Sequence, residues 1–299
     1  TRSPVANSAL TPHIATGEQG WAPARGRKRG HGGGTAAVIA ANVVAAAAFV
    51  WPLVASAAPA QAQSAAPYIA VAAAPLAVIL VFAALDASIR SAHTLALLAV
   101  LAAIGAAIRV ASTGVGGVEA LFVLLILAGR AYGPRFGLLL GAASLALSAL
   151  LWGGIGPWLP FQMFACGWVG AGAGLLPRRI RGIPEIAMLS AYGVAASYVF
   201  GLIMNLWFWP FAVGGGTSIS YLPDGPIGEN LTNFLVYSLL TSTAGWDTLR
   251  AITTVVGLAV VGRAVLRSLR RAKPIAPATP GAPRAPRARV REPERVAGR

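Results

Sequence analysis

Long apolar runs with almost no charge recur along most of this chain, and they constrain its fold more than any other feature. Apolar residues make up 56% of the 299 residues and charged residues 11%, and the mean hydropathy is +0.68. An average soluble domain carries about 25% charged residues. In a bilayer, backbone groups must be satisfied within the chain, which helices achieve. We therefore expect an all-α integral membrane protein.

Eight apolar segments are expected to form the spans. The first two cover residues 36–58 and 68–85, and a short polar break follows them. The other six cover residues 94–108, 118–128, 136–152, 160–176, 186–208 and 248–261. The segment 118–128 is shorter than the roughly 20 residues of a span, so it is expected to be broken or partly buried in protein. The prediction is a six-helix bundle at residues 93–271, preceded by two accessory transmembrane helices at residues 35–92.

The first apolar segment has two interpretations. Basic residues between positions 25 and 29 precede it, and small residues suited to cleavage lie near Ala62, as in a secretory signal peptide. The run at residues 36–58 is longer than the roughly 7 to 15 residues of a signal core. We therefore favour a retained span. Because residue 1 is Thr and not Met, the true start of the chain stays open.

The net charge of +15 belongs mainly to the two ends of the chain. Of the 24 Lys and Arg residues, five precede residue 35 and eleven lie at or after residue 263. Residues 1–34 and 272–299 are expected to be disordered basic ends, the second rich in Pro, Ala and Arg. A basic balance confined to the ends favours contact with the lipid bilayer over nucleic-acid binding.

The remaining basic residues predict the orientation. If the N-terminus is inside, six arginines lie in inner loops and two at outer positions. The inner ones are Arg90, Arg130, Arg135, Arg178, Arg179 and Arg181, and the outer ones are Arg109 and Arg250. This bias follows the positive-inside rule. We expect a multi-pass membrane protein with both termini in the cytoplasm.

The sequence lacks the residue patterns for metal binding, nucleotide-phosphate binding and nucleophilic catalysis. Cys166 is the single cysteine, and the three histidines are scattered without a ligand set, so no metal site is predicted. No stretch matches the phosphate-binding pattern GxxxxGK[ST], and no Ser, His and carboxylate set indicates a nucleophile with its base. No cofactor and no catalytic residue are predicted.

Polar and aromatic residues gather at two connections expected on the outer side. The turn GGIGPWLP carries Trp158 and follows Trp152, and Gln162 lies one turn into the next apolar helix, where its amide needs a partner. Trp residues are also common interfacial anchors, so the alternative for both tryptophans is anchoring alone.

The second outer connection repeats this mixture. Asn205 and Trp207 end one span, Asn233 and Tyr237 lie on a short helix, and Asp247 and Arg250 open the last span. Asp247 and Arg250 are three residues apart and can pair on one helix face. The alternatives are a dipole-stabilised charge for Asp247 and an interhelical hydrogen bond for Asn205. The candidate substrate-binding residues are Trp152, Trp158, Gln162, Asn205, Trp207, Asn233, Tyr237, Asp247 and Arg250.

Small residues indicate close helix packing at two places. Ala99, Ala103 and Ala107 have AxxxAxxxA spacing, and Gly137 and Gly141 form GxxxG. Both patterns permit close approach of helices in a membrane. In so alanine-rich a chain, the spacing also arises by chance.

The motifs GPWLPFQM, NLWFWPF and GWDTLRA, with the segment from residue 117 to 177, resemble the substrate-specificity (S) subunits of energy-coupling-factor (ECF) vitamin transporters, in an actinobacterial form. The resemblance covers residues 93–271. It implies a six-helix subunit that binds a vitamin at its outer side and tips within the membrane during transport. It also implies a transmembrane coupling subunit, docked on Ala99, Ala103 and Ala107, and two cytoplasmic ATPases.

The accessory spans and the basic C-terminal tail depart from the usual form of such subunits. Two other function classes stay open. One is an integral-membrane enzyme acting on lipid-linked substrates, with Asp247 or Glu119 as an acid or base. The other is a structural membrane protein without a ligand. For the cargo, the long outer loop at residues 212–231 favours cobalamin over riboflavin, thiamine or a smaller base.

Overall fold

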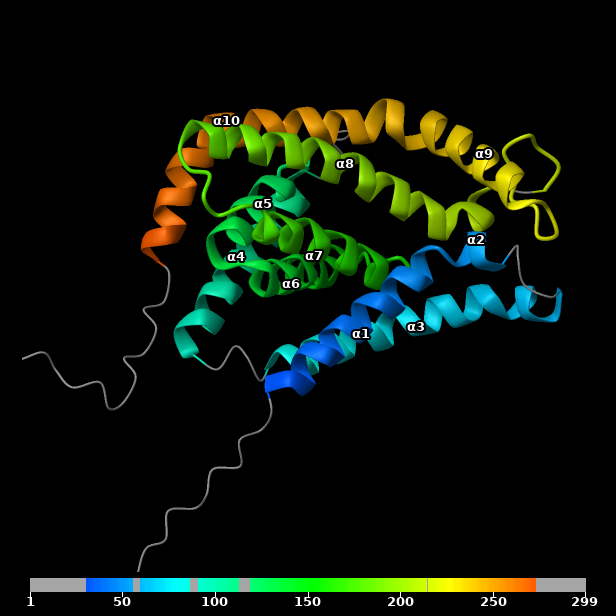
Figure 1. Ribbon diagram of the computed structural model, residues 1–299, viewed down its shortest axis with the longest axis horizontal. Helices are drawn as coiled ribbons and strands as arrows, with labels where there is room; N and C mark the ends of the chain where they lie inside the picture. The colour runs from blue at the N-terminus through cyan, green and yellow to red at the C-terminus, as the bar shows by residue number, and fades with distance from the viewer. Residues whose placement is uncertain (1–30, 56–59, 87–90, 113–118, 214, 273–299) are drawn as a thin grey trace, which may run out of the picture.

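The computed structural model is helical through nearly all of the chain that it describes. The described residues are 31–55, 60–86, 91–112, 119–213 and 215–272. The basic ends expected at residues 1–34 and 272–299 lie outside this part except for residues 31–34 and 272. Within it the chain forms a helical hairpin followed by a bundle of longer helices (Figure 1). This architecture confirms the expected all-α membrane fold.

The hairpin consists of α1 (His31–Phe49), the short α2 (Trp51–Ala55) and α3 (Ala60–Asp86). The predicted first span at residues 36–58 is interrupted, because the helix breaks at Val50, and its last three residues lie outside the described part of the chain. Pro52 explains the break: it lacks a backbone N–H, and its ring would clash with the carbonyl four residues earlier in a continuous helix. The second accessory helix begins earlier than predicted, at Ala60.

The described part of the bundle contains six helical units in chain order. They are α4 (Ala92–Ser112), α5 (Leu121–Tyr132), α6 (Pro134–Trp152), α7 (Leu159–Leu175), α8 (Ile183–Ala212) and a final composite of α9 (Ile227–Ser238), the π-helix η1 (Leu239–Asp247) and α10 (Thr248–Arg271). The last prediction needs correction, because the separate short helix and the span at residues 248–261 are one continuous helix of 45 residues.

Four of the described helical segments are long and apolar enough to cross a membrane. They are α4, α6, α8 and the composite from Ile227 to Arg271. The apolar stretches of α1, α3 and α5 are shorter. α5 has 12 residues and spans about 18 Å, against about 30 Å of hydrocarbon. Every residue from Leu121 to Ala131 is buried, as expected for a short apolar segment enclosed by protein.

Glycine allows α6 and α7 to pack backbone against backbone. A Cβ atom added to Gly141 would clash with backbone atoms of Cys166 and Gly167, and one added to Gly137 would clash with the backbone of Gly170. The predicted GxxxG pair on α6 therefore does mediate close packing, and glycines of α7 form the other side of the contact.

Contacts between helix termini define two ends of the bundle. At one end, which we call the arginine end, Arg130 of α5 donates hydrogen bonds to the carbonyls of Leu176, Pro177 and Ile180. Tyr132 donates to the carbonyl of Leu269 near the end of α10. α1 starts and α10 ends on this side of the molecule, at the left of Figure 1.

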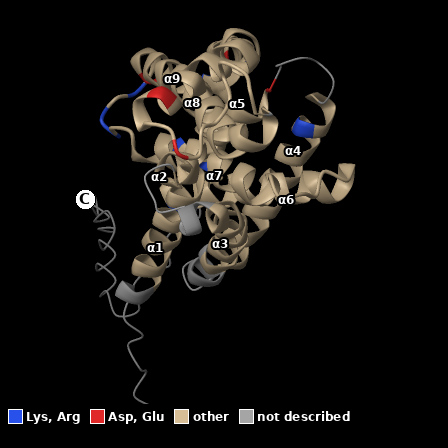
Figure 2. Cartoon of the chain, turned by 90° about the vertical axis from the view of Figure 1, so that its right-hand side faces the viewer, with Lys and Arg blue, Asp and Glu red and all other residues tan. Residues whose placement is uncertain are grey.

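The opposite end, which we call the tryptophan end, contains the ends of α6 and α8, the start of α7 and all of α9. Trp209 of α8 packs on Phe234 of α9 and donates a hydrogen bond to Ile219 O in the loop between them. Viewed from this end, most of the chain is uncharged, with short segments of basic and acidic residues (Figure 2). The assignment of the two ends to the inner and outer sides of the membrane stays a prediction.

Three hydrogen bonds, at different positions along the hairpin, join it to the bundle. Arg135 Nη2 of α6 lies 2.6 Å from Thr35 Oγ1, and Trp168 Nε1 of α7 lies 2.6 Å from Asn42 Oδ1. Near the tryptophan end, Trp51 Nε1 donates to the carbonyl of Trp207 at 3.1 Å. The hairpin is thus a fixed neighbour of α6, α7 and α8.

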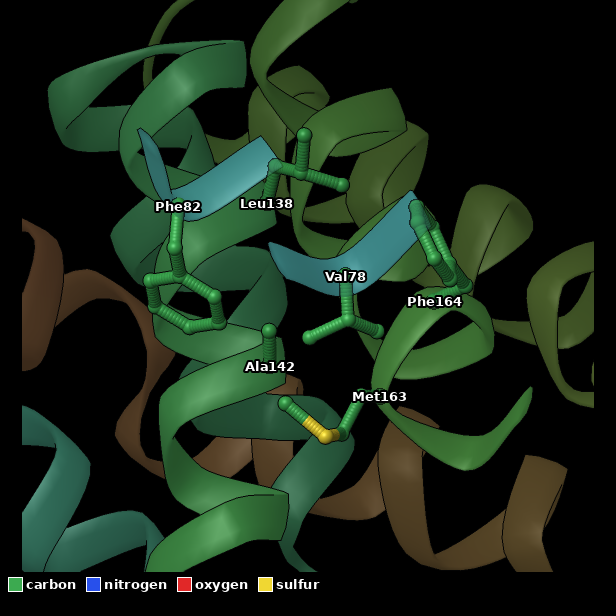
Figure 3. A pocket seen from close by; sticks show the side chains of 6 residues that line it. All are labelled: Val78, Phe82, Leu138, Ala142, Met163 and Phe164. Carbon is green, nitrogen blue, oxygen red and sulfur yellow. The ribbon is translucent and has the colours of Figure 1, made fainter. Parts of the chain in front are cut away.

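An apolar pocket remains between this hairpin and the bundle (Figure 3). α3, α6 and α7 line it with Val78, Phe82, Leu138, Ala142, Met163 and Phe164. These side chains carry no hydrogen-bonding N or O atom, so the pocket lacks the groups needed to recognise a polar substrate.

Candidate functional site

Three charged side chains meet in the interior, and we call them the central ionic cluster: Glu119, Asp247 and Arg250. Arg250 Nη1 lies 2.6 Å from Asp247 Oδ1, and its Nε lies 2.5 Å from Glu119 Oε2. The predicted pairing of Asp247 with Arg250 is therefore present. Asp247 is fully buried, whereas the Glu119 side chain is 25% exposed.

The π-helix η1 positions Asp247. Ser242 Oγ donates to Asp247 Oδ2 at 2.8 Å, and Thr248 Oγ1 donates to Thr243 O at the same distance. Both bonds join residues five apart, which is the hydrogen-bond spacing of a π-helix. On α8, Gly201 leaves room for the carboxylate, because a Cβ at that position would overlap both carboxylate oxygens of Asp247. π-helical segments occur frequently at functional sites.

Two aromatic rings enclose the Arg250 guanidinium. Its carbon lies 4.7 Å from the Phe200 ring centroid and 5.5 Å from that of Phe122. Arg250 also donates a hydrogen bond to Ser197 O, which lies 12 residues, or about 18 Å, beyond Glu185 along α8. Ser197 is the fifteenth of the 30 residues of α8, so the central ionic cluster lies near the middle of that helix. Ionisable groups within membrane-spanning segments usually belong to a binding or transport site.

A second polar group, the Arg109 cluster, joins α4, α6 and α7. Arg109 donates to Ser148 Oγ at 3.1 Å and to Gln162 Oε1 at 3.2 Å. Gln162 therefore has a polar partner, as its place in an apolar helix requires.

An aromatic stack joins α7 to α8. The rings of Phe161 and Trp207 are parallel within 3°, with centroids 4.3 Å apart, and Phe49 of the accessory hairpin packs edge-on against Phe161. Trp207 is buried, and in the described part of the chain its Nε1 has no hydrogen-bond acceptor. A buried N–H without an acceptor is costly, so this donor is available to a bound molecule.

Other predicted site residues hold the loop at the tryptophan end. Asn233 donates to Ser220 O at 3.1 Å, and Tyr237 is buried beside Trp209 and Phe234. Asn205 donates to Ser238 Oγ at 2.9 Å, which joins α8 to the residue preceding the π-helix. Asn233 and Tyr237 therefore take part in packing the loop, and Asn205 supports the start of η1.

Trp152 and Trp158 lie on the surface of the tryptophan end. Their exposed fractions are 62% and 41%, and Trp158 donates to Gly154 O within its own turn. This arrangement agrees with the alternative of interfacial anchoring.

The three alanines expected to dock the coupling subunit share an exposed face of α4. Ala99, Ala103 and Ala107 are exposed, whereas Ala102 and Ala106 of the same helix are buried against the bundle. The face of small residues is open along at least two turns.

Sequence reasoning missed several residues of these clusters. Arg109 and Ser148 were not among the candidates, and Glu119 was considered only as an acid or base of an enzyme. The available signal was Arg109, a cation beside an apolar run in a chain with little internal charge. Ser148 has no such signal, because serine in a transmembrane helix commonly bonds its own backbone.

A comparison with models of known protein families identifies the family, and its matched range ends just before Asp247 and Arg250. The family model of the ECF-type riboflavin transporter S component matches residues 87–246, slightly more than half of the chain. No curated protein and no solved structure matches significantly. The matched range contains α4 to α9, and the accessory hairpin lies outside it.

The match decides between the function classes left open by the sequence. An S component is a substrate-binding subunit of a transporter in the bacterial plasma membrane, where it works with coupling and ATPase subunits; it is not an enzyme. The actinobacterial form stays a prediction. The chain belongs to the family of S components of ECF-type riboflavin transporters.

Proposed function

We propose that the central ionic cluster and the Arg109 cluster form a substrate site for a flat heteroaromatic vitamin, and that this vitamin is riboflavin. The observation that carries the proposal is the meeting of one arginine and two carboxylates, from separate segments of the chain, in the interior of the bundle. Such groups are expensive in a bilayer, and binding a substrate gives a reason for their presence.

The hydrogen-bonding groups suit the polar edge of a flavin. Its pyrimidine ring alternates carbonyl acceptors with an N–H donor. Arg109 and Arg250 supply donors for carbonyl oxygens, and the partly exposed Glu119 supplies an acceptor for an N–H group. Trp207 Nε1, which has no acceptor among the described residues, offers one more donor for a carbonyl oxygen.

The loop favours riboflavin over cobalamin, the cargo expected from the sequence. Cobalamin was expected because a long loop could cover a large ligand. Asn230 accepts a hydrogen bond from Leu222 N and donates one to Leu222 O, and Trp209 donates to Ile219 O. These bonds commit the loop to packing against α8 and α9. The description of the matching family also points to riboflavin.

The remaining assignments follow from the same proposal. The arginine end faces the cytoplasm under the positive-inside rule, with both termini on that side. Residues 93–271 form the substrate-binding domain, and residues 35–92 are retained accessory helices. The exposed face at Ala99, Ala103 and Ala107 docks the coupling subunit, which two ATPase subunits drive.

The test is a binding titration of the purified full chain in detergent, followed by flavin fluorescence. Riboflavin bound beside tryptophan is expected to lose fluorescence, and Asp247→Asn and Gln162→Leu should weaken its binding. Glu229→Gln is the matched control, because Glu229 is an exposed carboxylate on α9 away from both clusters. Equal affinity in all variants would contradict the proposed site. Displacement of riboflavin by a lower concentration of cobalamin would restore cobalamin as the cargo.

A further inference from the structure

Exposed arginines gather at the arginine end, on three separate elements. The loop between α7 and α8 carries Arg178, Arg179 and Arg181, the start of α6 carries Arg135, and the last turns of α10 carry Arg263, Arg267 and Arg271. All seven are exposed. The carboxylate with a described side chain at this end is Glu185, which is buried and already paired. The exposed cations therefore form a surface of one sign.

A buried ionic network holds these elements together. Glu185 Oε1 lies 2.6 Å from both Arg130 Nε and Arg270 Nη2, so α5, α8 and α10 share one carboxylate. Arg130 also donates to three carbonyls between residues 176 and 180, which fastens the loop that carries the arginine triplet. The Arg178 guanidinium lies beside Gly133, at the turn leading to Arg135.

The arginines of α10 occupy one side of an amphipathic segment. Arg263, Arg267 and Arg271 recur every four residues and share a face. The opposite face carries buried Leu266 and Leu269, which pack on the bundle. The last turns of α10 therefore present a cationic strip while remaining fixed to the protein.

Exposed apolar side chains border the arginines. Leu175 and Ile183 flank the triplet on the α7–α8 connection, and Val260 and Val261 lie just before Arg263. A surface that changes from apolar to arginine within one turn matches the boundary between hydrocarbon and headgroups. A soluble acidic partner would not need the apolar border.

We propose that the arginine end is a binding surface for anionic phospholipids, with lipid phosphates bound by the Arg178–Arg179–Arg181 triplet and the α10 strip. The basic side chains among the described residues, histidine aside, all belong to arginine. The two lysines, Lys28 and Lys273, lie outside the described residues. The planar guanidinium fork binds phosphate through two parallel hydrogen bonds, which an ammonium group cannot do. Each cation near an anionic surface changes binding by about fivefold.

The experiment compares lipids retained by the full chain after extraction from vesicles of phosphatidylglycerol and phosphatidylcholine in equal amounts. Native mass spectrometry counts each lipid on the wild type and on the triple variant Arg178→Gln, Arg179→Gln, Arg181→Gln. Wild type should retain phosphatidylglycerol in excess, and the excess should fall at least about fivefold in the variant. The tails and the α10 strip are unchanged in both proteins and provide a common background.

Two further variants make the result decisive. In the first, Arg178, Arg179 and Arg181 are replaced by Lys; the charge is kept, and part of the phosphatidylglycerol excess should remain. In the second, Arg263, Arg267 and Arg271 are replaced by Gln, and the phosphatidylglycerol excess should fall independently of the triplet. Thermal unfolding of each variant reports that the protein is folded. Equal lipid ratios in wild type and in both Gln variants would overturn the proposal. A Gln triplet that keeps the lipid excess but loses its transporter partners would assign the surface to protein docking instead.

Discussion

The two ionic clusters of the bundle use the same kinds of side chain in opposite proportions. Around Glu185, which we call the terminal ionic cluster, one carboxylate serves Arg130 and Arg270, and Arg130 also donates to three carbonyls. In the central ionic cluster two carboxylates share Arg250. In the terminal cluster the arginines have more N–H donors than the carboxylate can accept, and backbone carbonyls accept the rest. In the central cluster the two carboxylates have more acceptor capacity than the one arginine fills.

This difference separates a structural network from a candidate binding site. The terminal cluster joins helix ends through groups whose hydrogen bonds are made within the protein. In the central cluster, the described contacts give Asp247 two hydrogen bonds and Glu119 one, while a carboxylate can accept about four. Unused acceptor sites on buried carboxylates of a membrane protein therefore favour a role in binding a substrate.

The largest expected effect comes from breaking the terminal cluster. Glu185→Gln removes the charge that compensates the buried Arg130, and losing one partner of a buried ion pair costs about 3 to 5 kcal/mol. Thermal unfolding in detergent should show a large fall in melting temperature. Riboflavin affinity of the folded fraction should stay at the wild-type value; a parallel loss of affinity would show that the two clusters are not separate in function.

Asp247→Asn should have the reverse profile. The substitution keeps the shape but removes a charge that Arg250 needs, so riboflavin affinity should fall by about tenfold or more. The melting temperature should fall less than in Glu185→Gln, because Glu119 still pairs with Arg250. Titration and unfolding on the same preparation check both, and unchanged affinity would remove Asp247 from the site.

Ser242→Ala should produce a smaller change of the same kind. It deletes the hydroxyl that bonds Asp247 across the π-helix, and a single hydrogen bond contributes about 0.5 to 1.5 kcal/mol. We expect riboflavin affinity to fall a few-fold, measured by the same titration. Ser268→Ala, at an exposed serine of α10 outside both clusters, is the matched control. Equal effects of the two substitutions would mean that the π-helical bond does not position Asp247.

Arg270→Gln tests how much the terminal cluster depends on its outer partner. The Arg270 side chain is 30% exposed, and the ion pair between Glu185 and the buried Arg130 remains after the substitution. Exposed ion pairs contribute about 1 kcal/mol or less. The melting temperature should therefore change far less than in Glu185→Gln, and an equal fall would show that Arg270 is as important as Arg130.

Ala103→Leu should leave both clusters unchanged. The residue is exposed on α4, so stability and riboflavin affinity should stay near wild type. Co-purification with the coupling subunit should be lost, because leucine prevents close helix approach at a small-residue face. Leu95→Ala is the control, since it changes another exposed position of α4 but removes bulk and cannot block approach. Intact co-purification of Ala103→Leu would contradict the docking assignment.

Local sequence patterns were sufficient for the class of fold and for the approximate limits of most helices. Apolar runs separated by short polar or proline-containing turns require helices in a bilayer, since backbone groups find no water there. The spacing of Asp247 and Arg250 predicted their pairing, because residues three apart on a helix are neighbours. The GxxxG pair on α6 predicted close packing for a similar local reason.

The meeting of distant residues depends on tertiary packing instead. Glu119 reaches Arg250 across 131 positions, and Gln162 meets Arg109 across 53. No local pattern encodes such pairs, because they depend on how the helices are rotated and tilted against each other. The same holds for Asn233 and Tyr237, whose residue types suited a ligand site but whose neighbours form a loop. Periodicity acts within one helix, whereas a binding site is made between helices.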